Sequence, residues 1–405
     1  MYCLIFYLDN LIETDTYISE RAITMELSEI REKLDVVDKQ LLDLFLQRMN
    51  LVDQVAEIKK NQSQALYDPK REREILSRIH DAAGEPHGAA AHQLFRTLLE
   101  LSRARQAAQL ISKTNVSAVV DELCAHEQSV FPQTGRIACA GIEGSNAQMA
   151  ADRLFSRGDV VYLDSFSAVA KAVKAGLCQY GVLPIENSTT GSIRRVYDIL
   201  CDPELSVIRS LRLLVRHVLL TQPNAEISQI RTIYTHEQAA AQCSKFLSEL
   251  SGVDVIPCKS TAHAAKRAAD AADPSVAAIA GEVCAKLYGL TVLSADIQNQ
   301  QNNGTRFVCI TKGSVCYAGA DRLSLMLTTQ NRAGALFDLL AKISALGINL
   351  CKLESVPIQG SNFSYRFYMD LETSLHQEGL LGLLSELERS CDEFRLLGCY
   401  SEIAE

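Results

Sequence analysis

The apolar residues between positions 30 and 58 follow a helical period. Their spacing alternates between four and three residues, which predicts one long helix with a single buried stripe: Ile30, Leu34, Val37, Leu41, Leu44, Leu51, Val55 and Ile58. The slot between Leu44 and Leu51 holds Arg48 instead, and Lys59 lies eleven residues further on, within about 20° of the same face. An unpaired guanidinium in an apolar stripe is costly unless an anion meets it. The pattern therefore predicts a buried anionic ligand; the alternative is that both side chains reach solvent past a coiled-coil seam.

Two further helices are predicted within a domain that spans residues 25–112. Asp68 and Pro69 supply an N-cap and a first-turn proline, so a second helix begins there and carries Arg71 and Glu72. Asp68 is fully explained by capping alone, which is the alternative to a role in a site. A third helix is predicted over residues 91–108, where Ser102 and Gln106 share one face because they are four residues apart.

Strand and helix patterns alternate from residue 136 to residue 311, after a segment (113–134) that has no clear pattern and is interpreted as a linker. The predicted strands are Ile137–Ile142, Val160–Leu163, Tyr180–Ile185, Thr232–Tyr234, Val253–Pro257, Val276–Ala280 and Phe307–Ile310. The predicted helices between them are Ala147–Phe155, Ser167–Ala175, Glu237–Leu250 and Thr261–Ala272. This order predicts a two-lobed α/β domain over residues 135–312, laid out like a periplasmic binding protein. We expect residues 206–295 to form the second lobe, with the ligand in the cleft between the lobes.

The stretch from Leu183 to Ile193 carries the strongest candidate site. It leaves a buried strand, turns polar and small, and enters the predicted helix Arg194–Leu200. Backbone N–H groups and a helix dipole then point at one spot, which suits a small anion. The alternative is an ordinary turn in which Ser188 or Ser192 caps the helix.

Four strand-to-helix junctions are expected to line the cleft. Their candidate binding residues are Ser145 and Asn146, then Glu186, Asn187, Ser188 and Ser192, then His236, and finally Ser260 and Thr261. Each serine and threonine has an N-cap as its alternative role, and His236 has a structural one.

The C-terminal segment, residues 321–402, reads as strand, helix, strand, strand, helix, strand. The strands are Leu323–Thr328, Ile348–Ile358, Phe363–Leu371 and Glu393–Ser401, and the helices are about Gly334–Leu346 and Gln377–Cys391. This order predicts a ferredoxin-like βαββαβ unit.

Composition places the chain among ordinary globular proteins, with 47% apolar and 22% charged residues in 405. A net charge of -9 and the lack of a basic block argue against a nucleic-acid partner. The 13 cysteines have no metal-binding spacing and are interpreted as reduced thiols of a cytoplasmic protein. The apolar opening at residues 2–8 is too short to span a bilayer, so no membrane role is predicted. Residues 1–24 are interpreted as a poorly structured extension, with Met25 as an alternative start.

Residues 25–110 resemble the all-helical type of chorismate mutase. The matching positions are I-R-E-K-L-D at 30–35, Q-R at 47–48, Lys59, D-P-K-R-E at 68–72, Ser102 and Gln106. The resemblance implies an intertwined homodimer in which each pocket borrows an arginine from the partner, and Arg31 matches that arginine. Arg31 lies about 100° around the helix from Arg48, so the two would not face one pocket of the same chain.

Two stretches of the α/β segment resemble the signature stretches of prephenate dehydratase. They are P-I-E-N-S-T-T-G-S at 184–192 and N-G-T-R-F at 303–307, supported by A-I-A at 278–280 and L-Y-G-L at 287–290. The resemblance implies that Thr305 handles the leaving hydroxyl by hydrogen-bond donation and that Arg306 binds a substrate carboxylate. It also implies that the substrate is prephenate.

The C-terminal unit resembles the ACT domains that bind amino acids and regulate metabolic enzymes. The residues that carry the likeness are Gly334, Ala335 and Leu336, then G-I-N-L at 347–350, including Asn349, and E-S-V-P at 354–357, including Glu354 and Ser355. Family members commonly have arginine where Val356 stands. The resemblance implies that L-phenylalanine binds between two chains and regulates the enzyme.

Together the resemblances imply rearrangement of chorismate to prephenate, followed by decarboxylation and dehydration to phenylpyruvate, with no metal or organic cofactor. The first reaction is pericyclic, so the protein must orient a dicarboxylate and stabilise charge on the ether oxygen. Arg31 and Arg48 would bind carboxylates, Lys59 and Gln106 the ether oxygen, and Glu72 the ring hydroxyl, while Ser102 and Asp68 orient their neighbours. Two alternatives stay open: arogenate as the dehydratase substrate, and a metabolite sensor that has lost catalysis.

Overall fold

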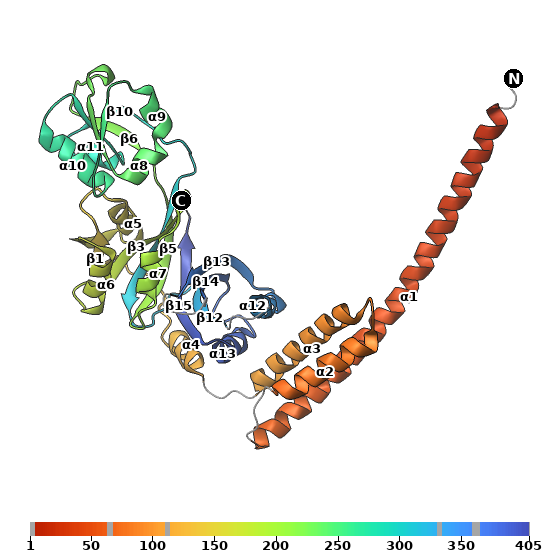
Figure 1. Ribbon diagram of the computed structural model, residues 1–405. Coiled ribbons are helices and arrows are strands. Elements are labelled where there is room, and N and C mark those ends of the chain that lie inside the picture. The colour runs from red at the N-terminus through yellow and green to blue at the C-terminus, as the bar shows by residue number, and fades with distance from the viewer. Residues whose placement is uncertain (1–4, 63–67, 110–113, 330–333, 359–364, 405) are drawn as a thin grey trace. The chain divides into compact units, whose positions relative to one another are not determined.

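The structure is a computed structural model that describes residues 5–62, 68–109, 114–329, 334–358 and 365–404. The chain divides into two compact units, Met1–Ser112 and Lys113–Glu405 (Figure 1). Among the described helices, none combines the length and the apolar character needed to cross a membrane.

The first unit consists of three helices, as predicted: α1 (Ile5–Gln62), α2 (Pro69–Ala83) and α3 (Gly88–Gln109). Helix α2 begins after Asp68, whose carboxylate accepts hydrogen bonds from the backbone N–H groups of Lys70 and Arg71. The prediction of a poorly structured extension differs from the structure, since α1 already begins at Ile5. The physical reason is that no glycine or proline precedes Pro69, so nothing interrupts the helix once it has begun.

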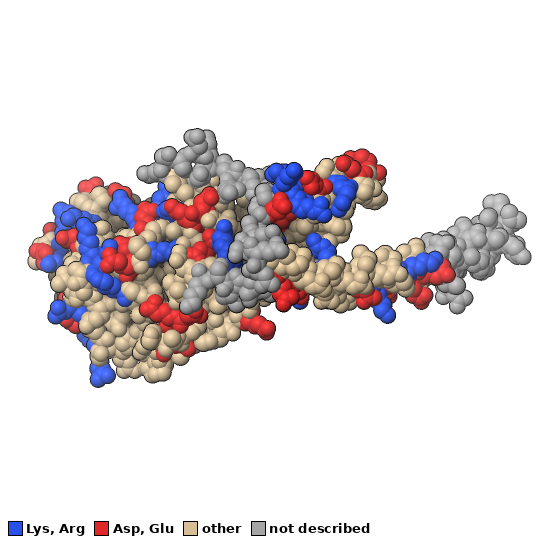
Figure 2. All heavy atoms as spheres, turned by 90° about the horizontal axis from the view of Figure 1, so that it is seen from below, with Lys and Arg blue, Asp and Glu red and all other residues tan. Residues whose placement is uncertain are grey.

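Helix α1 carries two apolar faces, and only one of them is covered within the unit. Met49, Val52 and Ala56 are buried, at 6%, 8% and 1% exposure, where α1 packs on α3. The stripe singled out in the sequence remains exposed in the described unit, with Leu44 at 61% and Leu51 at 60%. An extended uncharged stretch is visible along α1 in Figure 2. The prediction of a buried stripe is therefore not met by this chain alone.

The second unit opens with a helix that the sequence analysis took for a linker. Helix α4 (Asn115–Ala125) has a capping box formed by Thr114 and Ser117. Val116 and Val120 are buried in the same core cluster as Leu383 and Leu384 of helix α13 (Leu380–Ser390). Because these valines lie four residues apart on one face, the segment is an amphipathic helix packed on the C-terminal unit and not a linker.

The larger α/β lobe is built on six strands with helices α5 (Asn146–Leu154), α6 (Phe166–Lys174) and α7 (Arg194–Leu200). Its strands are β1 (Thr134–Ala140), β2 (Arg157–Leu163), β3 (Tyr180–Asn187), β4 (Gly191–Ser192), β5 (Leu205–Leu214) and β11 (Gly304–Lys312). Strand β11 lies between β5 and β3 and is antiparallel to both. This arrangement places Thr305 beside Asn187, so residues far apart in the sequence become neighbours.

The smaller lobe holds the second sheet, in the order β10-β6-β9-β7-β8. Its strands are β6 (Val218–Thr221), β7 (Thr232–Thr235), β8 (Asp254–Pro257), β9 (Val276–Ala280) and β10 (Thr291–Ser294). Its helices are α8 (Glu237–Gln242), α9 (Ser244–Glu249), α10 (Thr261–Ala271) and α11 (Val283–Tyr288), with a short 3-10 turn at Ile227–Gln229. The lobe begins near residue 218 and not at residue 206, because β5 belongs to the larger sheet.

The single helix predicted over Glu237–Leu250 is two helices, α8 and α9. They meet at Cys243, where the segment that returns to the larger lobe takes over part of the helical hydrogen bonding. The N–H of Asn299 donates to the carbonyl oxygen of Gln242 (2.7 Å), and the N–H of Lys245 donates to Oδ1 of Asn299 (3.1 Å). The helix therefore breaks where the crossing segment contacts it.

The C-terminal unit has the predicted βαββαβ order. It consists of β12 (Arg322–Thr328), α12 (Ala335–Ala345), β13 (Asn349–Pro357), β14 (Tyr365–Glu372), α13 (Leu380–Ser390) and β15 (Glu393–Ile403). Strand β15 also pairs in parallel with β5, so the sheet continues without interruption as β13-β14-β12-β15-β5-β11-β3-β1-β2. At Gly398 the strands approach so closely that a Cβ atom would lie 2.1 Å from the carbonyl oxygen of Val207. Only glycine fits there.

Candidate active sites

The first candidate site lies between α1 and α3 of the helical unit. Arg48 donates from Nη1 to the carbonyl oxygen of Leu98 (3.1 Å) and to the hydroxyl of Ser102. Burial lowers the pKa of Arg48 from its ordinary value, although the guanidinium remains fully charged at neutral pH. The predicted cation is thus fixed beside Ser102, on the border of the exposed stripe.

Gln106 is a buried polar residue of this site whose carbonyl group is unpaired within the described part of the chain. It is 7% exposed, and its Oε1 atom has no hydrogen-bond partner among the described residues. A buried amide carbonyl without a partner costs about 1–3 kcal/mol. It lies one helical turn from Ser102, as the sequence predicts, so both buried polar side chains lie on one face of α3.

The remaining predicted residues of this unit are less enclosed. Glu72 forms a two-pronged ion pair with Arg103, an arginine that the sequence analysis did not single out. Lys59 is partly buried, whereas Asp68 and Arg71 are exposed. Arg31 is exposed and lies 17 residues before Arg48, which at 1.5 Å per residue is about 26 Å along the helix. Arg31 therefore cannot join the Arg48 cluster of its own chain.

The second candidate site is organised around Asn187, at the end of β3. Its Oδ1 accepts hydrogen bonds from the N–H and hydroxyl groups of Thr189 and Thr190, with the two N–H bonds at 3.0 and 3.2 Å. Its Nδ2 donates to Oδ1 of Asn303 (3.1 Å), to the carbonyl oxygen of Gly304 (3.2 Å) and to Oγ1 of Thr305 (2.9 Å). One amide thus holds the turn after β3 against the start of β11.

This contact determines what the hydroxyl of Thr305 can do. Thr305 is 9% exposed, and Asn187 occupies an acceptor position on its Oγ1. A hydroxyl has one hydrogen, and the contact with Asn187 does not use it. The donor role that the sequence analysis expected for Thr305 stays a prediction, and the contact with Asn187 is compatible with it.

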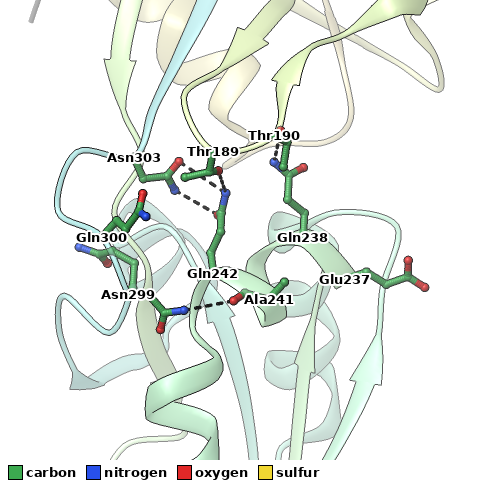
Figure 3. A pocket seen from close by; sticks show the side chains of 10 residues that line it. Thr189, Thr190, Glu237, Gln238, Ala241, Gln242, Asn299, Gln300 and Asn303 are labelled. Carbon is green, nitrogen blue, oxygen red and sulfur yellow. Dashed lines mark hydrogen bonds between the residues drawn. The ribbon is translucent and has the colours of Figure 1, made fainter.

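A cleft of about 540 Å³ lies between the lobes next to this turn, and Figure 3 shows its lining residues. They are Thr189, Thr190, Glu237, Gln238, Ala241, Gln242, Gln298, Asn299, Gln300 and Asn303. Gln238 donates to Oγ1 of Thr190 (3.0 Å), and Gln242 donates to Oγ1 of Thr189 (2.6 Å). Amides of the smaller lobe thus contact hydroxyls of the larger lobe. The sequence analysis did not pick out Gln242, because glutamine on a helix has no distinctive pattern, and it quoted Asn303 only as part of the N-G-T-R-F stretch.

Arg306 contacts residues of the C-terminal unit and is not among the residues that line this cleft; that it binds a substrate carboxylate stays a prediction. It is 6% exposed, and its Nη1 donates to Oδ2 of Asp370 (2.6 Å) while its Nη2 donates to the hydroxyl of Tyr400 (2.8 Å). Its Nε lies 2.8 Å from Oε2 of Glu402. Successive residues of a strand point to opposite faces of a sheet, so Thr305 lies on the face of Asn187 and Arg306 lies on the face of the C-terminal unit.

Glu186 and Ser192 contact the C-terminal unit as well, and neither is among the residues that line this cleft. Glu186 forms an ion pair with Lys352 of β13 and lies 3.5 Å from Arg306. The hydroxyl of Ser192 donates to Oε2 of Glu354 (2.9 Å) and accepts from Lys352 (3.2 Å). These contacts make a polar cluster that joins β3 and β4 to β13.

Most of the other predicted binding residues serve as helix caps. Ser145, Ser260 and His236 accept hydrogen bonds from the first turns of α5, α10 and α8 respectively, and Asn146 and Thr261 are the first residues of α5 and α10. Ser188 instead bridges to β11, through the N–H of Gly304 (2.9 Å) and the carbonyl oxygen of Asn302 (3.0 Å). Helix α7 begins after Ile193 without a side-chain cap, so the alternative in which Ser188 or Ser192 caps it is wrong.

The six residues chosen as regulatory lie on two neighbouring elements of the C-terminal unit. Gly334 adopts a left-handed conformation (φ 82°) just before α12, with no side-chain cap, and Ala335 and Leu336 begin the helix. Asn349 donates to Oε2 of Glu372 (2.9 Å). Glu354 is held by Ser192, whereas Ser355 is exposed.

Two family patterns match the chain. The chorismate mutase type II family matches residues 30–107, and the prephenate dehydratase family matches residues 137–315. The bifunctional chorismate mutase/prephenate dehydratase of Escherichia coli strain K12 is 32% identical over 380 residues, covering 92% of this chain and 96% of that protein. Arogenate dehydratase/prephenate dehydratase 2 of Arabidopsis thaliana is 35% identical over 277 residues, covering 65% of this chain and 72% of that protein.

A solved structure shows the same fold in the second unit. Prephenate dehydratase from Arthrobacter aurescens, in complex with L-Phe, is 28% identical with a TM-score of 0.60. It covers 66% of this chain, and 89% of its own chain is matched.

Proposed function

Because the chain belongs to the family of bifunctional chorismate mutase/prephenate dehydratases, we propose that its two reactions take place at separate sites, one in each unit. The protein rearranges chorismate to prephenate and then converts prephenate to phenylpyruvate in phenylalanine biosynthesis. The observation that carries the two-site proposal is that the Arg48 cluster and the Asn187–Thr305 cluster are built from different units. We place both reactions in the cytoplasm, in keeping with the free thiols of the described cysteines.

In the helical site, Arg48 binds a carboxylate of chorismate and Gln106 donates to the ether oxygen. Rotation of the Gln106 amide by 180° exchanges its carbonyl and NH₂ ends, so the residue can present a donor to the ligand. Glu72, oriented by its ion pair with Arg103, accepts a hydrogen bond from the ring hydroxyl of chorismate. Lys59 donates a second hydrogen bond to the ether oxygen. The reaction needs no nucleophile, and each preorganised donor of this kind contributes on the order of 3 kcal/mol to transition-state stabilisation.

The exposed stripe on α1 supports a homodimer in which a second copy of this helix covers it. Eight large apolar residues of the stripe are exposed in the described unit, and burial of one such side chain contributes about 1.5–3 kcal/mol. A partner helix would also bring its own Arg31 to the Arg48 cluster, which Arg31 of the same chain cannot reach. Arg31 then completes the site in trans.

In the cleft, Thr305 donates a hydrogen bond to the departing hydroxyl group while Asn187 holds its oxygen. The cleft wall is made mainly of neutral amides and hydroxyls, and this suits a reaction that expels carbon dioxide. A cation would stabilise the ring carboxylate more in the ground state than in the transition state, where its charge moves into the ring. Neutral hydrogen-bond donors orient that carboxylate but do not oppose the movement of its negative charge into the ring.

Crossed point variants test the two-site proposal. Arg48→Ala should abolish chorismate rearrangement and leave prephenate turnover within about threefold of normal. Thr305→Ala should lower prephenate turnover by at least about 100-fold, the scale of a lost proton-handling group, and spare the mutase. Thr305→Ser, which keeps the hydroxyl, is the matched control. Equal loss of both activities in either variant, with the circular dichroism spectrum unchanged, would overturn the two-site proposal.

We further propose that L-phenylalanine binds the C-terminal unit at the start of α12 and inhibits dehydration. The L-Phe complex of the Arthrobacter aurescens enzyme supports this, as does Gly334, which leaves N–H groups open to a carboxylate. Ala335→Asp would place a repelling carboxylate beside that of the ligand. Ser344→Asp, on the exposed far end of the same helix, is the control. Titration calorimetry should show binding lost only in the first variant, and equal binding in both would refute the site.

Arogenate is the second candidate substrate for the cleft, favoured by the likeness to the Arabidopsis thaliana enzyme. Arogenate carries an ammonium group where prephenate has a keto group, and Glu237 on the cleft wall offers a carboxylate for it. Initial rates with both substrates at matched concentrations decide between them. Glu237→Gln should reduce turnover of arogenate alone.

A further inference from the structure

A buried histidine lies on the segment that crosses between the lobes. His217 stands between the end of β5 and the start of β6, and it is 3% exposed. Its backbone is fixed on both sides, since its N–H donates to Oε1 of Gln298 (2.9 Å) and its carbonyl oxygen accepts from the N–H of Ile297 (3.1 Å). Its Nε2 lies 2.9 Å from Oε1 of Gln242, whereas its Nδ1 has no partner among the described residues.

The hydrogen bonds around Gln242 assign the proton on His217. Oε1 of Gln242 also accepts from Nδ2 of Asn303 (3.1 Å), while Nε2 of Gln242 donates to Oγ1 of Thr189 (2.6 Å) and lies 3.5 Å from Oδ1 of Asn303. An amide oxygen can only accept, so the facing Nε2 of His217 must carry a hydrogen. Nδ1 is then the unprotonated nitrogen, which agrees with its lack of an acceptor. Burial also lowers the pKa of His217, which keeps the ring neutral.

This assignment matters because the two ends of an amide have nearly the same shape. Gln242 and Asn303 face each other as two amides, and their mutual hydrogen bonds can be drawn in either direction. At one end of this series the backbone N–H groups of Thr189 and Thr190 fix the amide of Asn187. At the other end the Nε2–H group of His217 is a second fixed donor, and it holds the NH₂ group of Gln242 toward Thr189 in the cleft. The same series continues from Oδ1 of Asn303 to Nδ2 of Asn187, and from there to Oγ1 of Thr305.

We propose that His217 is a positioning residue of the dehydratase site, which acts by fixing the orientation of the Gln242 amide. The inference rests on the proposed function of the cleft and adds a residue from outside its lining. His217 touches no substrate. It sets which end of the Gln242 amide faces Thr189, on the turn that Asn187 holds against Thr305.

Two substitutions separate hydrogen bonding from packing. His217→Leu removes the donor, so the amide of Gln242 can rotate; we expect kcat for prephenate to fall by about 10- to 100-fold, the range typical of such supporting contacts. His217→Gln places an NH₂ group where Nε2 stands and should stay within about threefold of normal. Chorismate rearrangement, carried out in the other unit, is the internal control. Arg216→Ala, at a 66% exposed neighbour on the same crossing segment, should leave both rates unchanged.

A double-variant cycle tests whether His217 acts through Gln242. Gln242→Ala combined with His217→Leu should be no slower than Gln242→Ala alone, because the residue to be oriented is already gone. The inference is overturned if His217→Leu turns over prephenate normally, if the glutamine variant is as slow as the leucine variant, or if the two losses multiply. If Gln242→Ala is fully active while Thr305→Ala is inactive, the inference fails and the proposed site stands. If both are fully active, the proposed site itself fails.

Discussion

Replacing Arg306 by methionine separates a structural arginine from a substrate-binding one. In the structure the guanidinium neutralises Asp370 and Glu402, whose side chains are 11% and 10% exposed. Removing one partner of a buried ion pair typically costs 3–5 kcal/mol. The lower end applies here, because Glu402 keeps its ion pair with Arg212 (2.9 Å). At roughly 2–4 °C per kcal/mol, a loss of about 3 kcal/mol lowers the Tm by about 6–12 °C.

The same substitution should leave the KM for prephenate within about threefold of normal when measured well below the Tm, since Arg306 faces away from the cleft. Adding Asp370→Asn removes the uncompensated carboxylate and should recover part of the lost Tm. A guanidinium that bound the substrate would instead contribute about 2–5 kcal/mol, which raises KM at least about 30-fold. Calorimetric unfolding and steady-state kinetics on the same preparations decide the matter. A KM raised that far, with an unchanged Tm, would refute the structural role.

Three further substitutions test other parts of the structure. Gln106→Leu should raise the unfolding free energy by about 1 kcal/mol, because it removes an unpaired buried carbonyl, while chorismate turnover falls at least about 100-fold; denaturant titration and initial rates measure the two, and a loss of stability would contradict the reasoning. Glu186→Gln should keep the KM for prephenate within about threefold of normal and lower the unfolding free energy by about 1 kcal/mol, since Glu186 pairs with Lys352. A large change in KM would instead show that Glu186 contributes to substrate binding. Burial lowers the pKa of His217. As the pH falls below about 6.5, the unfolded chain therefore takes up a proton that the folded chain does not, and the free energy of unfolding falls. Denaturant titrations at pH 7.5 and 5.5 should show a smaller fall in the free energy of unfolding for His217→Gln than for the natural chain.

Local patterns predicted the order of elements well, because apolar period and turn residues act over a few positions. The βαββαβ order, helix α7 and the strand that carries Thr305 follow from such patterns. The stretch that forms β5 was assigned to the second lobe, because its local sequence does not indicate which sheet it joins. Likewise the period of α1 indicates an apolar face and not which chain covers it.

The orientation of the site residues depended on distant partners and was harder to predict. Whether Arg306 faces a substrate or the protein is decided by Asp370 and Glu402, which lie 64 and 96 positions later in the chain. The orientation of Glu186 is decided in the same way by its ion pair with Lys352. Gln242 enters the site only because β11 returns Asn303 to the end of β3. No local sequence pattern predicts these contacts between distant residues.

The parallel pairing of β5 with β15 has a consequence for the order in which the chain is made. Strand β5 is complete once residue 214 has been synthesised, and β11 can cover one of its edges about a hundred residues later. Its other edge waits for residues 393–403, which are synthesised well after β11. Until then the N–H and C=O groups along that edge are unpaired and open to the strands of other nascent chains. Synthesis of residues 393–403, and not completion of the α/β lobe alone, is therefore the step that covers the second edge of β5.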